Sequence, residues 1–168
     1  MKNIYLVGFM GSGKSTVGKI LAEKLKMRFT DIDQLIEKEE GKAIPQIFKE
    51  KGEKYFRELE KKMLEKIQEE KNLVVSTGGG LGADRENMEK MKKNGLVVWL
   101  DVSFEEILKR CEGDQNRPLL NQPVEKIKKL YDKRIPIYKL AHIHIKTDNK
   151  KPEEIAEEII RNADIHRN

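Results

Sequence analysis

The sequence predicts an α/β protein in three layers (α/β/α), with a five-stranded parallel sheet between two layers of helices. Short apolar segments alternate along the chain with longer segments of helical periodicity. This alternation is typical of parallel sheets that helices cover on both faces. The length of 168 residues suits one compact unit with one core, and no repeat, low-complexity stretch or long linker divides it. We therefore expect residues 1–168 to form a single domain.

Five segments are expected to be strands because each is short, rich in apolar residues and bounded by turn or polar residues. They comprise residues 3–7, 28–31, 73–76, 96–100 and 142–146. In the last of them apolar and polar residues alternate, as in a strand with one exposed face.

The remaining periodic segments are expected to form helices. They comprise residues 14–25, 34–40, 44–51, 53–70, 84–93, 103–111, 124–138 and a last helix that begins near Pro152. Ser103 and Glu106 match the capping box at the start of a helix, and proline is favoured in a first helical turn. Residues 112–123 are polar and contain Gly113, Pro118 and Pro123, which predicts a loop.

The composition excludes several classes of protein. Charged residues make up 38% of the chain and the formal net charge is +5. Because positive and negative charges alternate finely, we expect no basic stripe that would follow a nucleic-acid backbone. The apolar runs are far shorter than the ~20 residues of a membrane span, and the N-terminus lacks a signal-peptide pattern. The single cysteine, Cys111, excludes an internal disulfide framework and fits a reducing compartment.

Residues 8–15, Gly-Phe-Met-Gly-Ser-Gly-Lys-Ser, match the phosphate-binding loop and lie between the first strand and the first helix. Glycines let backbone N–H groups turn toward a polyphosphate, and the start of a helix adds a partial positive charge. We expect Lys14 to reach the β- and γ-phosphates and Ser15 to ligate Mg²⁺. A dinucleotide site would need a third Gly or an Ala at position 16, but this residue is Thr16.

Two carboxylates, Asp31 and Asp33, follow the second strand. In extended backbone, residues two apart point to the same face, so both side chains could face one cleft. One could hold the metal and its water, while the other accepts the proton of an attacking hydroxyl. The alternative is that Asp33 only caps the following helix.

Arginine is scarce, since only eight of the 34 cationic residues are Arg, and its planar fork suits carboxylates and phosphates. Arg57 precedes Glu60 by one helical turn, either as a positioned cation or as a surface ion pair. Arg110 lies just before the polar loop, Arg117 within it and Arg134 in the helix after it. Within the loop, Arg117 could act as a lid cation.

Three glycines, 78–80, follow the third strand and allow the backbone to approach a ligand closely, although an ordinary turn would use them too.

Together these motifs resemble the shikimate kinase family, in the family's order and over nearly the whole chain. The matching segments are residues 8–19, Asp31-Ile32-Asp33, Gly52-Glu53, Phe56-Arg57, Glu60, residues 76–80, residues 117–120, Arg134, Pro136 and Tyr138. The resemblance implies a P-loop fold like that of nucleoside-monophosphate kinases, in a cytoplasmic monomer. It implies transfer of the γ-phosphoryl group of ATP to the 3-hydroxyl of shikimate, with Mg²⁺ as cofactor and neither nucleic acid nor membrane as partner.

The resemblance also implies residue roles, with substrate-binding helices at about 32–60 and a lid at about 112–123. Catalytic roles fall to Lys14, Asp33 and Arg117. ATP would be bound by Gly11, Ser12, Gly13, Lys14, Ser15, Thr16, Arg110, Arg117 and Pro152. Shikimate would be bound by Asp33, Phe48, Phe56, Arg57, Gly78, Gly79, Gly80 and Arg134. The metal would be held by Ser15 and Asp31.

Two other classes of function compete with this interpretation. A kinase of another small hydroxy acid such as gluconate, or of a nucleoside monophosphate, would use the same loop and lid. A GTP-dependent switch would need an Asn-Lys-x-Asp motif, but Asn149-Lys150-Lys151 is followed by Pro152. The switch motif Asp-x-x-Gly is absent from the sequence as well.

Overall fold

The computed structural model describes residues 2–111 and 123–167, which form a three-layer α/β/α arrangement. The central sheet has the strand order β2-β3-β1-β4-β5, and every neighbouring pair is parallel. Its strands are β1 (Asn3–Val7), β2 (Arg28–Asp31), β3 (Leu73–Ser76), β4 (Gly95–Asp101) and β5 (Ile143–Lys146). The predicted five-stranded parallel sheet is confirmed.

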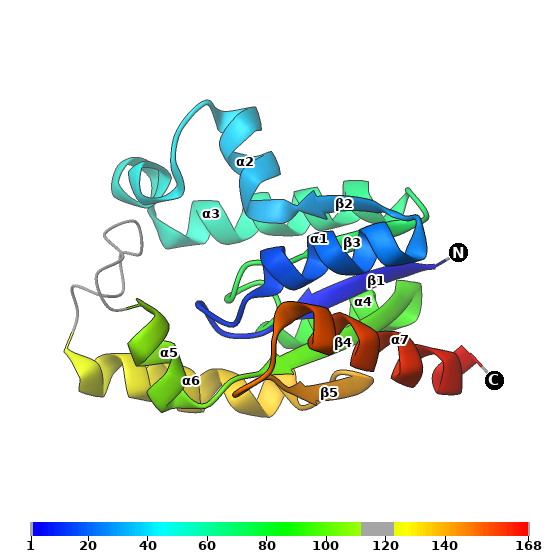
Figure 1. Ribbon diagram of the computed structural model, residues 1–168. Coiled ribbons are helices and arrows are strands. Elements are labelled where there is room, and N and C mark those ends of the chain that lie inside the picture. Colours follow the sequence, from blue (N-terminus) through cyan, green and yellow to red (C-terminus); the bar gives the residue numbers. More distant parts are fainter. Residues whose placement is uncertain (1, 112–122, 168) are drawn as a thin grey trace.

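Helices cover both faces of this sheet (Figure 1). They are α1 (Lys14–Leu25), α2 (Ile32–Glu40), α3 (Ile44–Gln68), α4 (Arg85–Asn94), α5 (Phe104–Cys111), α6 (Val124–Tyr138) and α7 (Pro152–Arg167). Helices α1 and α7 pack on one face, whereas α3, α4 and α6 contribute to the core on the other. None of the helices in the described ranges has the length and apolarity that crossing a membrane requires.

Strand β1 shows why the chain needs helices on both sides. Ile4 and Leu6 belong to the core under α1 and α7, while Tyr5 and Val7 belong to the opposite core. Because successive side chains of a strand point to opposite faces, an uninterrupted apolar strand must be covered twice. This central strand delivers the phosphate-loop residues to one edge of the sheet.

The helices after β2 differ from expectation at their boundaries. Helix α2 begins at Ile32, two residues early, because the N–H of Gln34 donates to Asp31 Oδ1 at 3.2 Å and so caps the helix. The expected division between helices at 44–51 and 53–70 is confirmed, because the span α3 consists of two helical segments that meet at a kink at Gly52. Gly52 has φ 87° and ψ 169°, a conformation that favours glycine.

The capping box at α5 forms only in part. The N–H of Glu106 donates to Ser103 Oγ at 3.2 Å, as expected. The reciprocal bond of a capping box, from the N–H of Ser103 to the Glu106 side chain, does not form. The N–H of Ser103 donates to Asp148 Oδ1 at 3.0 Å instead. Glu106 instead accepts from Arg110 Nε at 3.1 Å. A carboxylate from a distant loop and an arginine one turn away therefore replace the local contact.

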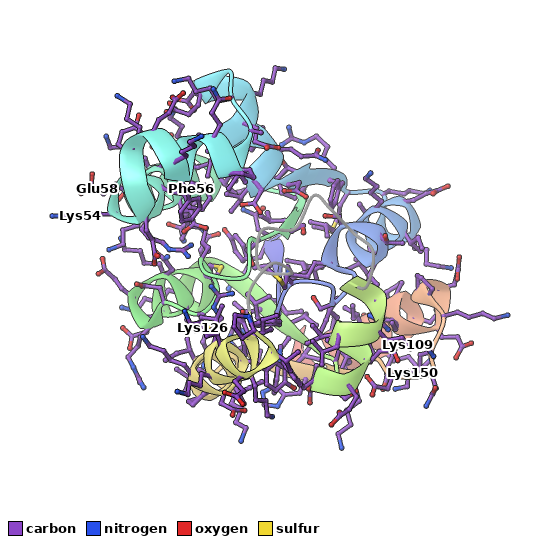
Figure 2. All side chains as sticks on the ribbon, turned by 90° about the vertical axis from the view of Figure 1, so that its left-hand side faces the viewer. Lys54, Phe56, Glu58, Lys109, Lys126 and Lys150 are labelled. Carbon is purple, nitrogen blue, oxygen red and sulfur yellow. The ribbon has the colours of Figure 1, made fainter. Side chains whose placement is uncertain are left out.

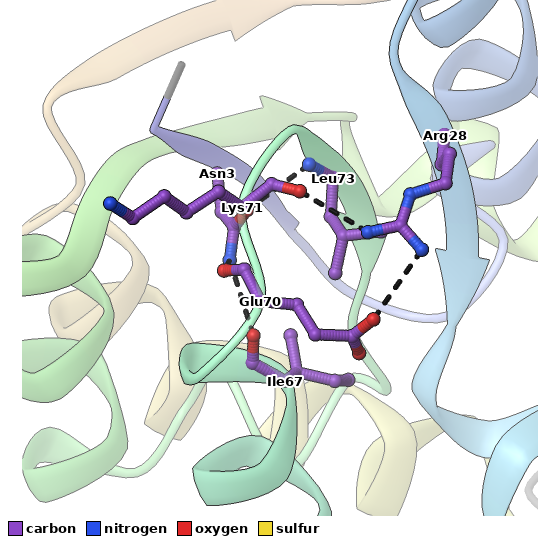
Figure 3. A network of polar contacts seen from close by, with 6 residues as sticks. All are labelled: Asn3, Arg28, Ile67, Glu70, Lys71 and Leu73. Atoms are coloured by element: carbon purple, nitrogen blue, oxygen red, sulfur yellow. Dashed lines mark hydrogen bonds and ion pairs between the residues drawn. The ribbon is translucent and has the colours of Figure 1, made fainter.

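A polar network closes the edge of the sheet where the strands begin (Figure 3). Asn3 is only 2% exposed. Its amide nitrogen donates to the carbonyls of Ile67 and Glu70 at 3.4 and 3.0 Å, and its Oδ1 accepts from Leu73 N at 3.1 Å. Arg28 adds bonds to Glu70 Oε1 and to the Lys71 carbonyl. One buried side chain thus joins β1, the end of α3 and the start of β3.

Candidate active site

The carboxyl ends of the five strands meet at one edge of the sheet, which Figure 2 views end-on. In such sheets ligands bind beyond this edge. Three segments that follow neighbouring strands converge there: the phosphate loop after β1, the start of α2 after β2, and residues 77–80 after β3. Helices α3 and α6 supply further side chains from either side.

The phosphate loop connects β1 directly to α1. Gly11 and Gly13 adopt φ of 76° and 85°, and Gly13 is the N-cap of α1. Residues other than glycine rarely adopt this left-handed backbone conformation. Ser12 is buried in the loop, whereas Thr16 is exposed on the first turn of α1. The free N–H groups at the start of α1 therefore lie next to the phosphate loop, which is a ready anion-binding arrangement.

Lys14 folds back over the same loop and is largely buried. Its Nζ donates to the Gly8 carbonyl at 2.6 Å, to the Phe9 carbonyl at 3.2 Å and to Ser12 Oγ at 3.4 Å. The loop thus holds a cation at the place where the motif requires one.

Ser15, Asp31 and Ser76 bring three oxygen donors together beside the loop. Ser15 Oγ donates to Asp31 Oδ2 at 2.7 Å and lies 3.3 Å from Ser76 Oγ. The described residues contain no cluster of three or more His, Cys, Asp or Glu side chains that could hold a metal alone. A hydroxyl and a carboxylate fit Mg²⁺, which takes oxygen ligands and usually keeps waters and substrate phosphates around it.

Asp33 lies in the first turn of α2, and not on an extended strand as its predicted orientation assumed. Its neighbour Asp31, and not Asp33, is the residue that caps the helix. Burial raises the pKa of Asp33 to about 6, and the charge of Asp31 adds to the rise, while Lys14 and Arg57 act against it. Within the described residues its buried Oδ1 has no hydrogen-bond partner. A carboxylate poised in this way can accept a proton near neutral pH.

Arg57 and Glu60 form an ion pair on the inner side of α3. Arg57 Nη1 donates to Glu60 Oε1 at 2.7 Å, and Glu60 is 1% exposed. Burial raises the pKa of Glu60 to about 7, and the negative charge of Asp33 contributes, although Arg57 opposes the rise. Of the two alternatives left open for Arg57, the buried Glu60 excludes an ordinary surface ion pair and favours a positioned cation.

Two phenylalanines of α3 line the same place. The ring centroids of Phe48 and Phe56 are 4.8 Å apart, and Arg57 Cζ lies 6.0 and 5.5 Å from them. Figure 2 shows Phe56 on the inner side of the helix, with Lys54 and Glu58 reaching outward. Phe48 and Phe56 therefore form an apolar wall next to a guanidinium group.

Each glycine of the segment 78–80 makes room for a different functional side chain. A Cβ on Gly78 would lie 2.7 Å from Asp33 Oδ1, and one on Gly79 would lie 2.8 Å from Arg134 Nη1. A Cβ on Gly80 would overlap the guanidinium group of Arg57. The three glycines thus gather one carboxylate and two guanidinium groups around one turn of backbone.

Arg134 comes from α6 and completes this group. Its Cζ lies 5.5 Å from the centroid of Phe9, within the phosphate loop. One helical turn later, Tyr138 Oη donates to the Gly79 carbonyl at 2.6 Å. Arg134 therefore lies between the phosphate loop and the turn formed by Gly78, Gly79 and Gly80.

The predicted adenine side is described in part. Arg110 Nη1 donates to the Gly11 carbonyl at 3.1 Å, which places Arg110 at the phosphate loop. Burial raises the pKa of Asp148, but hydrogen bonds from Ser103 and the charge of Arg110 outweigh it and lower that pKa. The loop before α7 thus approaches Arg110, and Pro152 begins α7 as expected. Arg117 and residues 112–122 of the predicted lid lie outside the described residues.

This geometry agrees with the relatives of the chain. The family model described as shikimate kinase matches residues 10–164. The chain belongs to the shikimate kinase family. A shikimate kinase from Sulfurihydrogenibium sp. (strain YO3AOP1) is 64% identical over 160 residues, which cover 95% of this chain and 96% of that protein. A solved shikimate kinase from Acinetobacter baumannii, in complex with shikimate, aligns with TM-score 0.92 and 41% identity over 97% of this chain and 93% of that one.

Membership in the shikimate kinase family confirms the predicted family, fold and class of enzyme. It supports a kinase of shikimate over a kinase of gluconate or of a nucleoside monophosphate. A solved gluconokinase from Sinorhizobium meliloti is 18% identical with TM-score 0.61, a likeness that shows a common fold alone. The nucleotide-switch alternative finds no support among these relatives.

The arrangement also contains residues to which sequence reasoning assigned no function. Ser76 lies at the carboxyl end of β3 and adds a hydroxyl next to Ser15. Phe9 packs under Arg134, and Tyr138 lies four residues after Arg134 on the same helix face. For Ser76 and Tyr138, the end of a strand and the helical spacing were usable signals. For Phe9 no sequence signal separates this role from ordinary core packing.

Proposed function

We propose that this chain transfers the γ-phosphoryl group of ATP to the 3-hydroxyl of shikimate, giving shikimate 3-phosphate and ADP. One observation carries the proposal: Asp33, Arg57 and Arg134 gather around Gly78, Gly79 and Gly80, next to a phosphate loop. A carboxylate and two guanidinium forks suit an acceptor that has hydroxyl groups and one carboxylate.

The phosphate loop binds the donor. Backbone N–H groups of Gly11, Ser12 and Gly13 and the start of α1 receive the phosphate oxygens, with Ser15 and Thr16 on the first turn. When ATP binds, the Lys14 ammonium group donates to the β- and γ-phosphates in place of the Gly8 and Phe9 carbonyls. Its positive charge then stabilises the phosphoryl group during transfer. Arg110 and the segment reaching Pro152 enclose the adenine.

Ser15 and Asp31 would hold Mg²⁺, since their hydroxyl and carboxylate oxygens meet beside the loop. When bound, the ion supplies positive charge that neutralises the phosphate oxygens. Ser76 lies within reach of the same place and orients Ser15.

Asp33 accepts the proton of the attacking hydroxyl. The hydroxyl oxygen forms a bond to the γ-phosphorus, the bond from that phosphorus to the bridging oxygen of ADP breaks, and the hydroxyl proton moves to Asp33 Oδ1. This oxygen is buried and has no hydrogen-bond partner among the described residues. A pKa of about 6 leaves Asp33 ionised at neutral pH, yet basic enough to take a proton.

Arg57 and Arg134 clamp the acceptor carboxylate, and the Gly79 backbone contacts the ring hydroxyls. Phe48 and Phe56 pack near the ring. Because these residues come from α3, α6 and the turn after β3, the acceptor is held from three directions. Such fixed orientation is what brings a hydroxyl into line with a phosphorus atom.

Residues 1–168 work as a single kinase domain, with substrate-binding helices at about 32–60 and a lid at about 112–123 that brings Arg117 to the phosphoryl group. The protein is a monomer in the cytoplasm. The described surface supports the monomeric state, since Val124, 55% exposed, is the only large hydrophobic side chain there that lies mostly in solvent. Monomeric proteins rarely expose larger apolar patches.

A coupled ADP-release assay with Mg²⁺ and ATP tests the proposal. We expect turnover with shikimate that exceeds turnover with gluconate or nucleoside monophosphates by at least about a hundredfold in kcat/KM. The Lys14→Met variant should lose turnover while its circular dichroism spectrum stays unchanged. Equal or greater activity on gluconate or on a nucleoside monophosphate would overturn the assigned acceptor.

A further inference from the structure

Tyr138 is a buried phenol at the end of α6 that the mechanism above does not use. It is completely shielded from solvent, and its ring stacks on Trp99 with centroids 6.1 Å apart. Its hydroxyl leaves the core at one point and donates to the Gly79 carbonyl at 2.6 Å. A buried phenol needs a partner for its hydroxyl, and here the partner is backbone in the glycine turn.

This hydrogen bond holds the peptide between Gly79 and Gly80, while the carbonyls of Gly78 and Gly80 accept from the N–H groups of Gly82 and Ala83 at 3.4 and 3.2 Å. The Gly79 carbonyl and the Gly80 N–H belong to one planar peptide unit and point in opposite directions. Consecutive glycines have the widest choice of backbone conformations. Holding the carbonyl against Tyr138 therefore also sets the direction of the Gly80 N–H and the path of the backbone through the turn.

The position of Gly79 in turn limits where Arg134 can lie. A Cβ on Gly79 would lie 2.8 Å from Arg134 Nη1 and 3.6 Å from Tyr138 Oη. On its other side, the guanidinium group packs on Phe9. Arg134 thus rests between a loop residue and a stretch of backbone that Tyr138 holds in place.

The phenol is suited to a permanent donor role. Burial raises the pKa of Tyr138 to about 12, even though the charge of Arg134 and a hydrogen bond from it act in the opposite direction. The hydroxyl therefore keeps its proton throughout the range in which an enzyme works.

We propose that Tyr138 is a positioning residue of the acceptor site, whose hydroxyl holds the Gly79 peptide and so sets the place of the Arg134 guanidinium group. This inference rests on the proposed function, because it assumes that Arg134 and Gly79 bind shikimate. Tyr138 touches neither substrate in this role and acts through its two neighbours.

A pair of hydroxyl deletions on the same helix tests it. Tyr138→Phe removes the bond to Gly79 together with the hydrogen bond from Arg134. The matched control Tyr131→Phe removes a similar bond, from Tyr131 Oη to the Val102 carbonyl at 3.0 Å. Both variants keep their ring packing. We expect Tyr138→Phe to raise the KM for shikimate about tenfold, the equivalent of one buried hydrogen bond, with the KM for ATP within about twofold of the parent. Tyr131→Phe should leave both constants unchanged.

A double-mutant cycle with Arg134→Lys shows whether Tyr138 acts through Arg134. We expect the two changes together to weaken shikimate binding by clearly less than the product of the separate effects. An unchanged shikimate KM in Tyr138→Phe, equal rises in both KM values in the two phenylalanine variants, or strictly multiplicative effects would overturn the inference. Absence of shikimate phosphorylation by the parent chain would instead overturn the proposed function, and the inference with it.

Discussion

Asp33 and Glu60 are two carboxylates that the fold buries within one group of charges. Burial raises the pKa of Asp33 to about 6 and that of Glu60 to about 7. The charge of Asp31 adds to the rise at Asp33, and the charge of Asp33 adds to the rise at Glu60. Arg57 opposes both rises in part, helped by Lys14 at Asp33 and by Arg134 at Glu60. Because buried carboxylates without sufficient compensation disfavour the folded state, this residue group lowers stability at the pH where it is ionised.

Replacement of Asp33 by Asn should separate the effect of this carboxylate on catalysis from its effect on stability. The variant loses the proton acceptor, so we expect kcat to fall by at least about a hundredfold. The folded-state pKa of Asp33 lies above its ordinary value of 3.8, so the folded state binds the proton more tightly than the unfolded chain does. Stability therefore falls as pH rises from about 4 to 6, and above that range the carboxylate lowers it by a constant amount. At pH 7.5 the half-buried residue becomes neutral in Asp33→Asn, and we expect the free energy of unfolding to rise by about 1–2 kcal/mol.

Chemical denaturation and a pH–rate profile measure these two effects. In the parent chain, kcat/KM for shikimate should fall below pH about 6 as Asp33 is protonated. Asp132→Asn, on the exposed side of α6, is the control and should change neither activity nor stability. A variant at Asp33 that is less stable than the parent, or a rate that does not change between pH 5 and 7, would contradict the assignment.

At the scale of elements, the turn after β3 joins three segments that are distant in the chain. Its glycines were predicted to let backbone approach a ligand. The structure shows a second reason for them, since Asp33, Arg134 and Arg57 each occupy the space in which a Cβ would lie. Such close approach has no tolerance for an added methyl group.

Gly80→Ala should therefore displace the Arg57 guanidinium group from its place beside Glu60. We expect the KM for shikimate to rise about ten- to hundredfold, because overpacking of this size costs about 1–3 kcal/mol. The KM for ATP should stay close to that of the parent. Steady-state kinetics with each substrate varied in turn provides the measurement.

Gly41→Ala is the control for loss of stability alone. Gly41 caps the end of α2 with φ 69°, and nothing lies within 4 Å of an added Cβ there. The left-handed conformation should cost an alanine about 1 kcal/mol of stability, without a change in the KM for shikimate. If Gly80→Ala behaves like Gly41→Ala, the glycine turn does not position Arg57.

At the scale of the whole molecule, the edge where the strands end and the edge where they begin have different roles. The carboxyl edge holds the charged group described above, whereas both chain termini and the Asn3 network lie at the opposite edge (Figures 1 and 3). The network joins residues about 65 to 70 positions apart through one amide. Stability supplied at that edge should be independent of substrate binding.

Asn3→Leu should accordingly lower stability and leave the site intact. The change leaves three backbone groups, two of them in buried hydrogen bonds, without this partner. We expect a loss of about 2–3 kcal/mol in the free energy of unfolding. Asn162→Ala is the control, since the Asn162 amide makes one bond within α7 and its loss should cost much less. Urea denaturation measures both. A change of more than about threefold in either KM for Asn3→Leu would show that the two edges are coupled.

The sequence by itself determined what depends on neighbours along the chain. Strand β1, the phosphate loop and α1 follow from apolar runs and glycine spacing, and the Arg57–Glu60 pair follows from one turn of helix. The tertiary structure alone decided which distant groups meet. Asp33 lies against Gly78, Ser76 reaches Ser15, and Tyr138 holds Gly79. These contacts join residues 59 to 61 positions apart in the last two cases, and their existence depends on the order β2-β3-β1-β4-β5. Local periodicity carries no information about that order, because it is set by the packing of all the helices on the sheet at once.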